Sequence, residues 1–258
     1  MLLLPPSQGK AGGGDGPSWR RSAHTFAALN PHRTEVVHAV RAALVAPQDG
    51  GQRLLDARGA TLERARTAWE ELDRAPTLPV WRRYSGVVWE ALVPPRPTAA
   101  QIRALDERVL VISALWGLLA GADRIPDYRL KMTAPLAPLG RPAAFWRPHI
   151  GAALDAHADD RWVIDLLARE QAAALDPRAL RRARLCHIEL VRNLADGHRR
   201  AAGHAGKQAK GRLAQAILRT GAHRPQDIAD LEVPGLRAVS VRVDALDAQV
   251  TFALSATR

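Results

Sequence analysis

Lysine is rare among the basic residues of this chain, and the few lysines are the first candidates for chemistry. Of 37 basic residues, all are arginine except Lys10, Lys131, Lys207 and Lys210. An ammonium is compact and can lose its proton, whereas a guanidinium is planar and stays charged, so a site that needs an amine cannot exchange lysine for arginine. We therefore expect these lysines to converge on one cleft. The alternative is that they are ordinary surface charges.

The segment 52–72 has the pattern of two short helices joined by a tight turn at Gly59. Such a helix–hairpin–helix presents backbone amides and a helix N-terminus to a phosphate, without reading base sequence. The residues expected to surround the phosphate are Arg58, Gly59, Thr61, Arg64 and Arg66. The alternative is a plain helical hairpin, because Thr61 stands where such motifs usually carry a second glycine.

A second candidate site follows the most β-branched segment, 109–113. Loops at strand ends are common places for binding sites. Asp127, Arg129 and Lys131 alternate, so an extended chain would place all three side chains on one side. With the neighbouring Trp116 and Tyr128, they could hold a phosphate or a polar substrate. The alternative is a structural network of ion pairs.

A third candidate lies in the glycine-containing segment 203–212, which also carries His204 and Arg212. Lys207 and Lys210 are spaced i, i+3, and we expect them to share a helix face opposite Leu213 and Ile217. Near a helix N-terminus these two ammonium groups would form an anion site. The alternative is a solvated helix face.

Two other groups of residues could suggest a serine nucleophile or a metal site, but their sequence context does not favour either. Ser7 and Lys10 match the Ser-x-x-Lys spacing of some acyl-enzymes, but the flanking prolines and glycines argue against the helical turn that this pair needs. His24, His32 and His38 lack the carboxylate pattern of a metal site and are expected at the surface. We therefore expect neither a metal ion nor another cofactor.

The elements that must position these residues form a mixed α/β pattern. We expect a single compact domain over 1–258, with a central mixed sheet, surrounding helices and the helix–hairpin–helix 52–72 inserted in it. Strands that pair in a buried sheet are expected at 2–4, 109–113 and 162–166, and a terminal hairpin at 239–243 and 250–254. Helices are expected over 31–45, 98–107 and 206–220, with a short one over 115–119. The five-glycine stretch 9–17 predicts a flexible loop.

The charge of the chain bounds its partners. The formal net charge of +11 favours a polyanion such as nucleic acid, or an acidic membrane surface, although an arginine-rich composition alone can also produce it. No window of about 18 apolar residues could span a membrane, and no signal peptide is recognisable, so we expect a cytoplasmic protein. The single cysteine, Cys186, excludes an internal disulfide and a thiolate zinc cluster.

Five strings together resemble the bacterial YaaA family of peroxide-stress proteins, nearly from end to end. They are LLLPPSQGK at the N-terminus, RYSGVVWEAL at 83–92, SALWGLLAGADRIPDYRLKM at 113–132, AAFWR at 143–147 and GKQAKGRLAQAIL at 206–218. The resemblance implies a mixed α/β fold with a helix–hairpin–helix and a basic cleft. It also implies DNA binding and protection against oxidative DNA damage and free iron. By resemblance, the cleft would be lined by Lys10, Tyr128, Arg129, Lys131, Lys207 and Lys210.

The sequence departs from the family pattern at several polar or aromatic positions. Gln8 stands where a glutamate is frequent, Ala168 and Gln171 replace a serine and a tyrosine, and Ala205 lies where an aromatic residue is frequent. A diverged relative with a specialised task is therefore a second hypothesis: an enzyme acting on a small anionic substrate, with Lys131, Lys207 or Lys210 as acid, base or Schiff-base group. A third is an interaction protein whose basic face docks an acidic partner.

Overall fold

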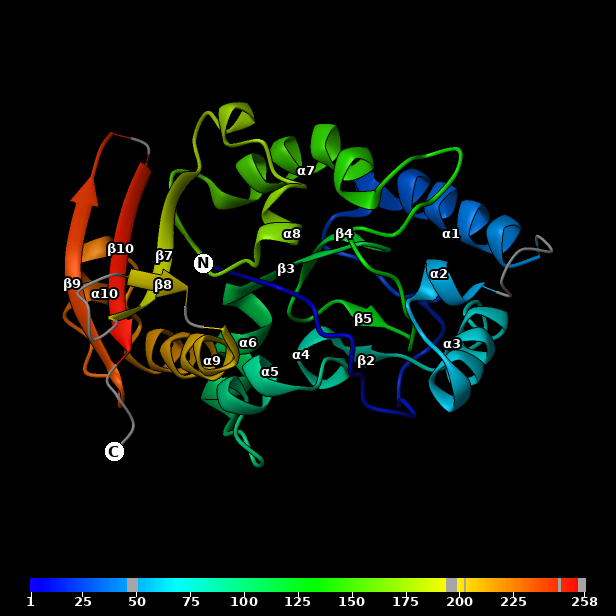
Figure 1. The fold of residues 1–258 in the computed structure, drawn as a ribbon, viewed down its shortest axis with the longest axis horizontal. Helices are drawn as coiled ribbons and strands as arrows, with labels where there is room; N and C mark the ends of the chain where they lie inside the picture. The colour runs from blue at the N-terminus through cyan, green and yellow to red at the C-terminus, as the bar shows by residue number, and fades with distance from the viewer. Residues whose placement is uncertain (46–50, 194–198, 202, 246, 255–258) are drawn as a thin grey trace.

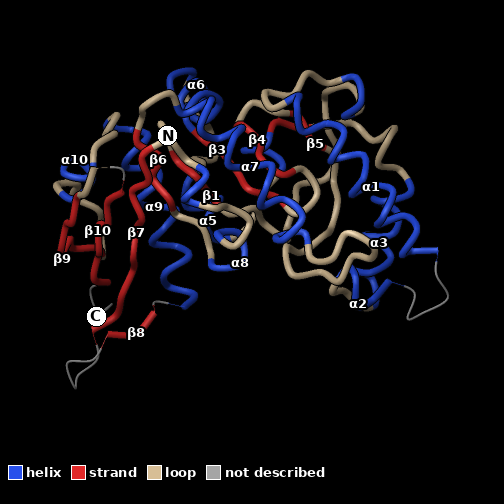
Figure 2. Tube along the Cα trace, turned by 90° about the horizontal axis from the view of Figure 1, so that it is seen from above, coloured by secondary structure: helices blue, strands red, loops and turns tan. Residues whose placement is uncertain are grey.

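The structure is a computed structural model that describes residues 1–45, 51–193, 199–201, 203–245 and 247–254. An eight-stranded mixed sheet runs through it, with the strand order β4-β3-β1-β6-β7-β10-β9 and with β8 paired to β7. The bounds are β1 Leu2–Leu4, β3 Val109–Ser113, β4 Gly117–Ala120, β6 Trp162–Asp165, β7 Arg184–Asn193, β8 Arg199–Ala201, β9 Leu236–Val243 and β10 Asp247–Leu254. The strands follow one another across the molecule in Figure 2, from β9 at one end to β4.

The middle of the sheet is parallel and fully buried. The leucines of β1 pair in parallel with β3 on one side and with β6 on the other. Leu2, Leu3 and Leu4 are all 0% exposed. A strand covered on both faces can be apolar at every position, which is why a run of three leucines forms the centre of this sheet. The predicted pairing of 2–4, 109–113 and 162–166 is confirmed, and so is the terminal hairpin, which β9 and β10 form.

Helices surround the sheet, as Figure 1 shows. Their bounds are α1 Asn30–Val45, α2 Gln52–Leu55, α3 Gly59–Glu70, α4 Val80–Arg83, α5 Val87–Leu92, α6 Ala99–Arg108, α7 Pro142–Ala158, α8 Arg169–Ala172, α9 Gly203–Thr220 and α10 Pro225–Ala229. Short 3-10 turns lie at Trp19–Arg21, Ala27–Leu29 and Pro177–Ala179, and β2 Leu78–Pro79 pairs with β5 Arg124–Ile125 as a separate two-stranded ribbon. One continuous apolar cluster, from Met1 to Phe252, joins these layers into the predicted single compact domain of mixed α/β class.

The predicted short helix over 115–119 is wrong: this segment forms a tight turn and the strand β4, antiparallel to β3. The hydroxyl of Ser113 accepts hydrogen bonds from the amides of Leu115 and Trp116, which closes the turn. Gly117 then adopts a φ of +65°, and a side chain there would meet the ring of Trp146 at 2.6 Å. The turn therefore depends on a glycine that a helical reading of the apolar pattern overlooks.

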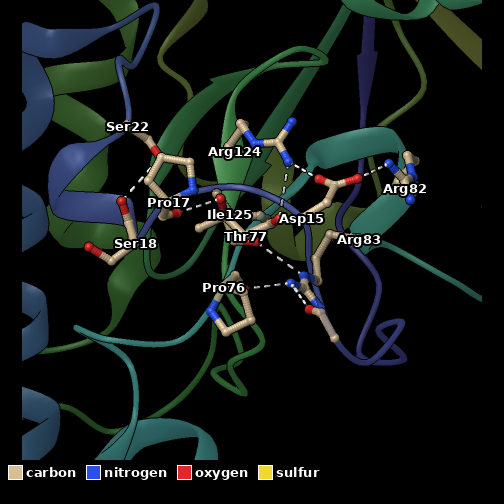
Figure 3. A network of polar contacts seen from close by, with 11 residues as sticks. Asp15, Pro17, Ser18, Ser22, Pro76, Thr77, Arg82, Arg83, Arg124 and Ile125 are labelled. Atoms are coloured by element: carbon tan, nitrogen blue, oxygen red, sulfur yellow. Dashed lines mark hydrogen bonds and ion pairs between the residues drawn. The ribbon is translucent and has the colours of Figure 1, made fainter.

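The glycine-rich stretch 9–17 is held in place, which corrects the prediction of a flexible loop. Arg83 is 0% exposed and its guanidinium donates to the carbonyls of Ala11, Gly13, Pro76 and Ile125. Arg124 and Arg82 both pair with Asp15 in the same stretch, as Figure 3 shows. Backbone carbonyls that are withdrawn from water need partners, and one buried arginine supplies a partner to four carbonyls here: the bond to Ile125 is buried and the other three are partly buried.

One histidine predicted at the surface is buried. His24 is 9% exposed and its ring contacts the carbonyl of Trp19 at 3.1 Å, so the expectation of a surface position is wrong for this histidine.

Within the part of the chain that the structure describes, no helix has both the length and the apolar character needed to cross a membrane.

Candidate functional site

A cavity of about 360 Å³ lies between the segment that follows β1, the first turns of α3 and the extended chain around residue 128. It is lined by Gln8, Gly9, Lys10, Ala60, Thr61, Arg64, Ala65, Asp127, Tyr128 and Arg129. Three separate candidate segments thus meet at one place. Because β1 and β3 are parallel and the chain leaves both at the same edge, the cavity lies outside the carboxyl ends of these strands, a common position for binding sites.

A buried hydroxyl cluster lies beneath this cavity. The hydroxyl of Tyr128 is 2.6 Å from the hydroxyl of Tyr84 and 2.7 Å from that of Ser113, the last residue of β3. Burial raises the pKa of Tyr128 to about 12 and raises the pKa of Tyr84 well above its usual range. Both phenols are therefore protonated at neutral pH, and they fix the Tyr128 ring against the sheet.

Lys10 places its ammonium nitrogen on the face of this ring. Nζ is 4.1 Å from the centroid of Tyr128 and 5.5 Å from that of Tyr84, and it donates to the carbonyl of Ser7 at 2.9 Å. Lys10 is 7% exposed. Burial lowers its pKa to about 7; Asp127 opposes this shift, while the nearby guanidinium groups of Arg129, Arg83 and Arg64 add to it. The amine is therefore partly neutral at physiological pH.

The carboxylate of Asp127 is engaged by Arg64 rather than by Lys10. Nη2 and Nε of Arg64 lie 2.9 Å and 3.1 Å from the same oxygen of Asp127, and Nη2 also donates to the carbonyl of Lys10. Arg129 donates to the carbonyls of Leu55 and Asp56 at 2.8 Å. These contacts attach α3 and the turn after α2 to the segments that carry Lys10 and Tyr128.

The predicted alternation of Asp127, Arg129 and Lys131 is present in the structure. Tyr128 and Leu130 point into the core, while the three charged side chains face the α2–α3 region. Lys131 forms an ion pair with Asp56, whose pKa is lowered by this hydrogen bond. Lys131 therefore joins the structural network that the sequence left as the alternative, and it does not line the cavity.

The segment 52–72 does form two helices, joined by residues 56–58. Gly59 is the first residue of α3, with a φ of +52° and open space in front of it. Arg58 is exposed and its side chain does not cap the helix. The helix N-terminus, with its unpaired amides and positive partial charge, is thus presented beside the cavity.

The lysines of α9 occupy two different environments, which corrects the prediction of a shared face. Lys207 is exposed, whereas Lys210 is half-buried and donates to the carbonyls of Leu166 and Leu167 at 2.8 Å. Lys210 is spaced i, i+3 and i, i+7 from Leu213 and Ile217, so it lies along their buried stripe rather than opposite it. Burial lowers the pKa of Lys210. Of the four lysines, the cavity lining includes Lys10.

Several other residues predicted for the site contact the rest of the protein and do not line the cavity. Trp116 is 0% exposed and packs edge-on against Trp19, 5.1 Å between centroids. Ser7 contributes its carbonyl to Lys10, and Arg212 is half-buried in α9. The side chain of His204 lies outside the described residues.

Of the positions that depart from the family pattern, Gln8 lines the cavity, whereas Ala168 is exposed before α8, Gln171 is buried and Ala205 is half-buried. The residues of the site that sequence reasoning missed are Tyr84, Ser113 and Arg83. Their signal was present, because two of them open the RYSG string and the third ends the 109–113 strand.

No group of three or more histidine, cysteine, aspartate or glutamate side chains suited to a metal ion occurs among the described residues. A second hollow of about 640 Å³ is lined by Tyr84 and by several residues of the segment 11–15. Its lining carries two carboxylates, Asp15 and Glu90, and one cation, Arg82. The cavity beside Lys10 is lined by three cations and one carboxylate and therefore offers the better anion site.

The family model and the similar proteins all indicate the same protein family. The family model described as peroxide stress protein YaaA matches residues 1–240. The chain is 32% identical over 246 residues to a UPF0246 protein of Streptomyces coelicolor, covering 95% of this chain and 92% of that protein. It is 31% identical over 224 residues to a UPF0246 protein of Corynebacterium efficiens, covering 84% of each chain. It is also 30% identical over 241 residues to one of Corynebacterium glutamicum, covering 88% and 89%.

Proposed function

Because this chain belongs to the YaaA family of peroxide stress proteins, we propose that it binds double-stranded DNA in the cytoplasm, without sequence preference, as part of protection against oxidative damage. The observation that carries this proposal is the open N-terminus of α3 beside a basic cavity. Gly59 leaves room for a phosphate, and Arg58 and Arg64 flank it. The net charge of +11 supplies long-range attraction to a polyanion.

The binding mode follows from the residue types. Backbone amides and arginines contact phosphates, which position a protein on DNA but carry no base information. The first turn of α3 is the expected centre of the interface, and the rim of the cavity extends it. A duplex cannot enter a cavity of about 360 Å³, so the phosphate backbone is expected to lie across its mouth.

We expect DNA affinity to fall steeply with salt. About five phosphate contacts release their counterions, which gives a slope of roughly −4 to −5 when log K is plotted against log salt. Fluorescence anisotropy with a labelled 20–30-base-pair duplex at several salt concentrations measures this slope, and a duplex of shuffled sequence should give about the same affinity. Absence of binding at low salt, or a flat dependence, argues against the proposal.

Replacement of Gly59 by valine should weaken DNA binding by roughly 1–3 kcal/mol, the cost of losing a charge-assisted phosphate contact. The φ of +52° also strains a β-branched residue, so some loss of stability is expected. Gly221→Val is the matched control, because Gly221 has a φ of +78° and is equally open. Both variants should lose similar stability, whereas DNA affinity should fall only for Gly59→Val. Equal affinities for the two variants would make 52–72 a structural hairpin only.

A second candidate function is binding of a small anionic substrate in the same cavity. The size of the cavity and the buried amine of Lys10 favour it, since both suit a small molecule better than a polymer. Reductive labelling of Lys10 by free glyoxylate, compared with trapping of DNA, distinguishes this function from DNA binding.

A further inference from the structure

Lys10 differs from the other lysines in what surrounds its amine. Lys131 is paired with a carboxylate, Lys210 donates to two carbonyls, and Lys207 is exposed. Lys10 faces a cavity, donates to one carbonyl, and has no carboxylate within ion-pair distance among the described residues. A buried amine without a counterion, open to a cavity, is the arrangement of a nucleophile.

The DNA component that an amine can attack is an abasic site. Its deoxyribose has lost the base, and the sugar opens to an aldehyde at C1′. Such a nucleotide is small and unstacks at low cost, so it can leave the duplex and enter a pocket. Its flanking phosphates would stay at the mouth of the cavity, where Arg64, Arg129 and the N-terminus of α3 lie.

We propose that Lys10 captures abasic sites in DNA by forming a Schiff base with the aldehyde carbon of the ring-opened sugar. This inference rests on the proposed DNA binding and names the substrate of the cavity beside it. Capture would suit a protein of a peroxide-stress family, because oxidative loss of bases creates these sites.

The chemistry balances without an additional reactant. The lone pair of Nζ forms a bond to C1′, and the carbonyl electron pair moves to the oxygen, which takes up a proton. Nζ gives up one of its two protons as the carbinolamine forms and the other as the hydroxyl leaves, so that the former carbonyl oxygen departs as water and a C=N bond replaces the former C=O bond. Amine and aldehyde thus give imine and water, and no atom changes its oxidation state overall.

The protonation state of Lys10 supports this role. An ordinary lysine, with a pKa near 10.4, is almost entirely charged at neutral pH and has no free lone pair. Burial lowers the pKa of Lys10 to about 7, so roughly half of the amine is neutral there. The charged and titratable groups that face it are Asp127, Arg64, Arg83, Arg129, Tyr84 and Tyr128. Capture should therefore accelerate from pH 6 to 8 and level off above.

The test uses the full chain and a duplex with one abasic site, prepared by enzymatic removal of a single uracil. Sodium cyanoborohydride delivers hydride to the imine carbon and converts the link to a stable secondary amine. We expect a covalent protein–DNA species on a denaturing gel. Peptide mapping by mass spectrometry should place the adduct on Lys10, which decides the assignment on the unaltered protein. An adduct on another lysine overturns it.

Matched controls separate this inference from DNA binding itself. A duplex with a tetrahydrofuran in place of the abasic sugar has no aldehyde, so it should bind but not be trapped. Lys10→Arg keeps the charge but cannot form an imine, and it should lower trapping at least about tenfold, whereas Lys207→Arg should trap normally.

Binding of both duplexes without trapping overturns the Schiff base and leaves the proposed function standing, whereas binding of neither overturns both. Reductive labelling of Lys10 by free glyoxylate without trapping of DNA overturns the abasic-site assignment and favours a small carbonyl substrate.

Discussion

Replacing Lys10 with methionine is expected to stabilise the folded protein at acid and neutral pH, although Lys10 lies in the candidate site. In the folded state its pKa is about 7, while in the unfolded chain it is about 10.4. At pH values between these two pKa values the unfolded state holds a proton that the folded state lacks. The free energy of unfolding of the wild type therefore rises with pH over this range. Below pH 7 the folded protein must bury a charged amine.

The gain from Lys10→Met should therefore be largest near pH 6, roughly 2–4 kcal/mol. It should shrink as the pH rises from 7 toward the unfolded-state pKa of about 10.4, because the cost of deprotonating the amine on folding falls over this range. Urea denaturation of wild type and variant at pH 6, 7.5 and 9 measures it, and the difference cancels groups common to both. Lys207→Met is the control, because Lys207 is exposed and its replacement should change stability by less than about 0.5 kcal/mol. If Lys10→Met is less stable than wild type at pH 6, the amine is not held at a cost, and its role is structural.

The central strands could be predicted from the sequence because their signals are local. The runs at 2–4, 109–113 and 162–166 are apolar at nearly every position, which is typical of a strand buried on both faces. The start of α6 is also local: Thr98 and Gln101 exchange hydrogen bonds as a capping box. The predicted helix start at 98 therefore differs from the observed one by a single residue.

The errors arise where one residue decides against a regional pattern. Apolar residues at 115–119 fit a helix as well as a strand, and the positive φ of Gly117 resolves the ambiguity. On α9, i, i+3 spacing put Lys207 and Lys210 on one face, but Lys207 is exposed, whereas Lys210 is half-buried and donates to the carbonyl of Leu166. Spacing gives relative positions on a helix; only packing shows which side is inward.

The scarcity of lysine does not indicate which of the four lysines lies at the cavity. Scarcity selected four lysines, and the structure places Lys10 at the cavity while Lys131 and Lys210 make structural contacts. Its distinguishing property is the cover provided by Tyr84 and Tyr128, which come from segments 74 and 118 residues away along the chain. No local pattern around residue 10 contains that information, because burial of an amine depends on long-range packing.

Arg83→Lys is expected to destabilise the protein strongly although the substitution is conservative. The guanidinium of Arg83 reaches four carbonyls, two in the glycine-rich stretch and one each at Pro76 and Ile125. An ammonium has three donors on a single atom and cannot span them, so at least one or two buried carbonyls lose their partner. Each costs about 1–3 kcal/mol, and the expected loss of stability is roughly 2–5 kcal/mol. Since the charge is kept, the loss reports geometry alone.

The neighbouring residue supplies the control for this change. Arg82 is exposed and pairs with Asp15 at the surface, so Arg82→Lys should cost less than about 1 kcal/mol. Urea denaturation compares the two variants. Where Arg83→Lys still folds, trapping of abasic DNA should also weaken, because the amide of Ala11 donates to the carbonyl of Arg83 and the same backbone holds Lys10 against Tyr84. Equal stability of both variants would mean that water replaces the guanidinium at these carbonyls, and the segment that carries Lys10 would then owe its position to the tyrosines.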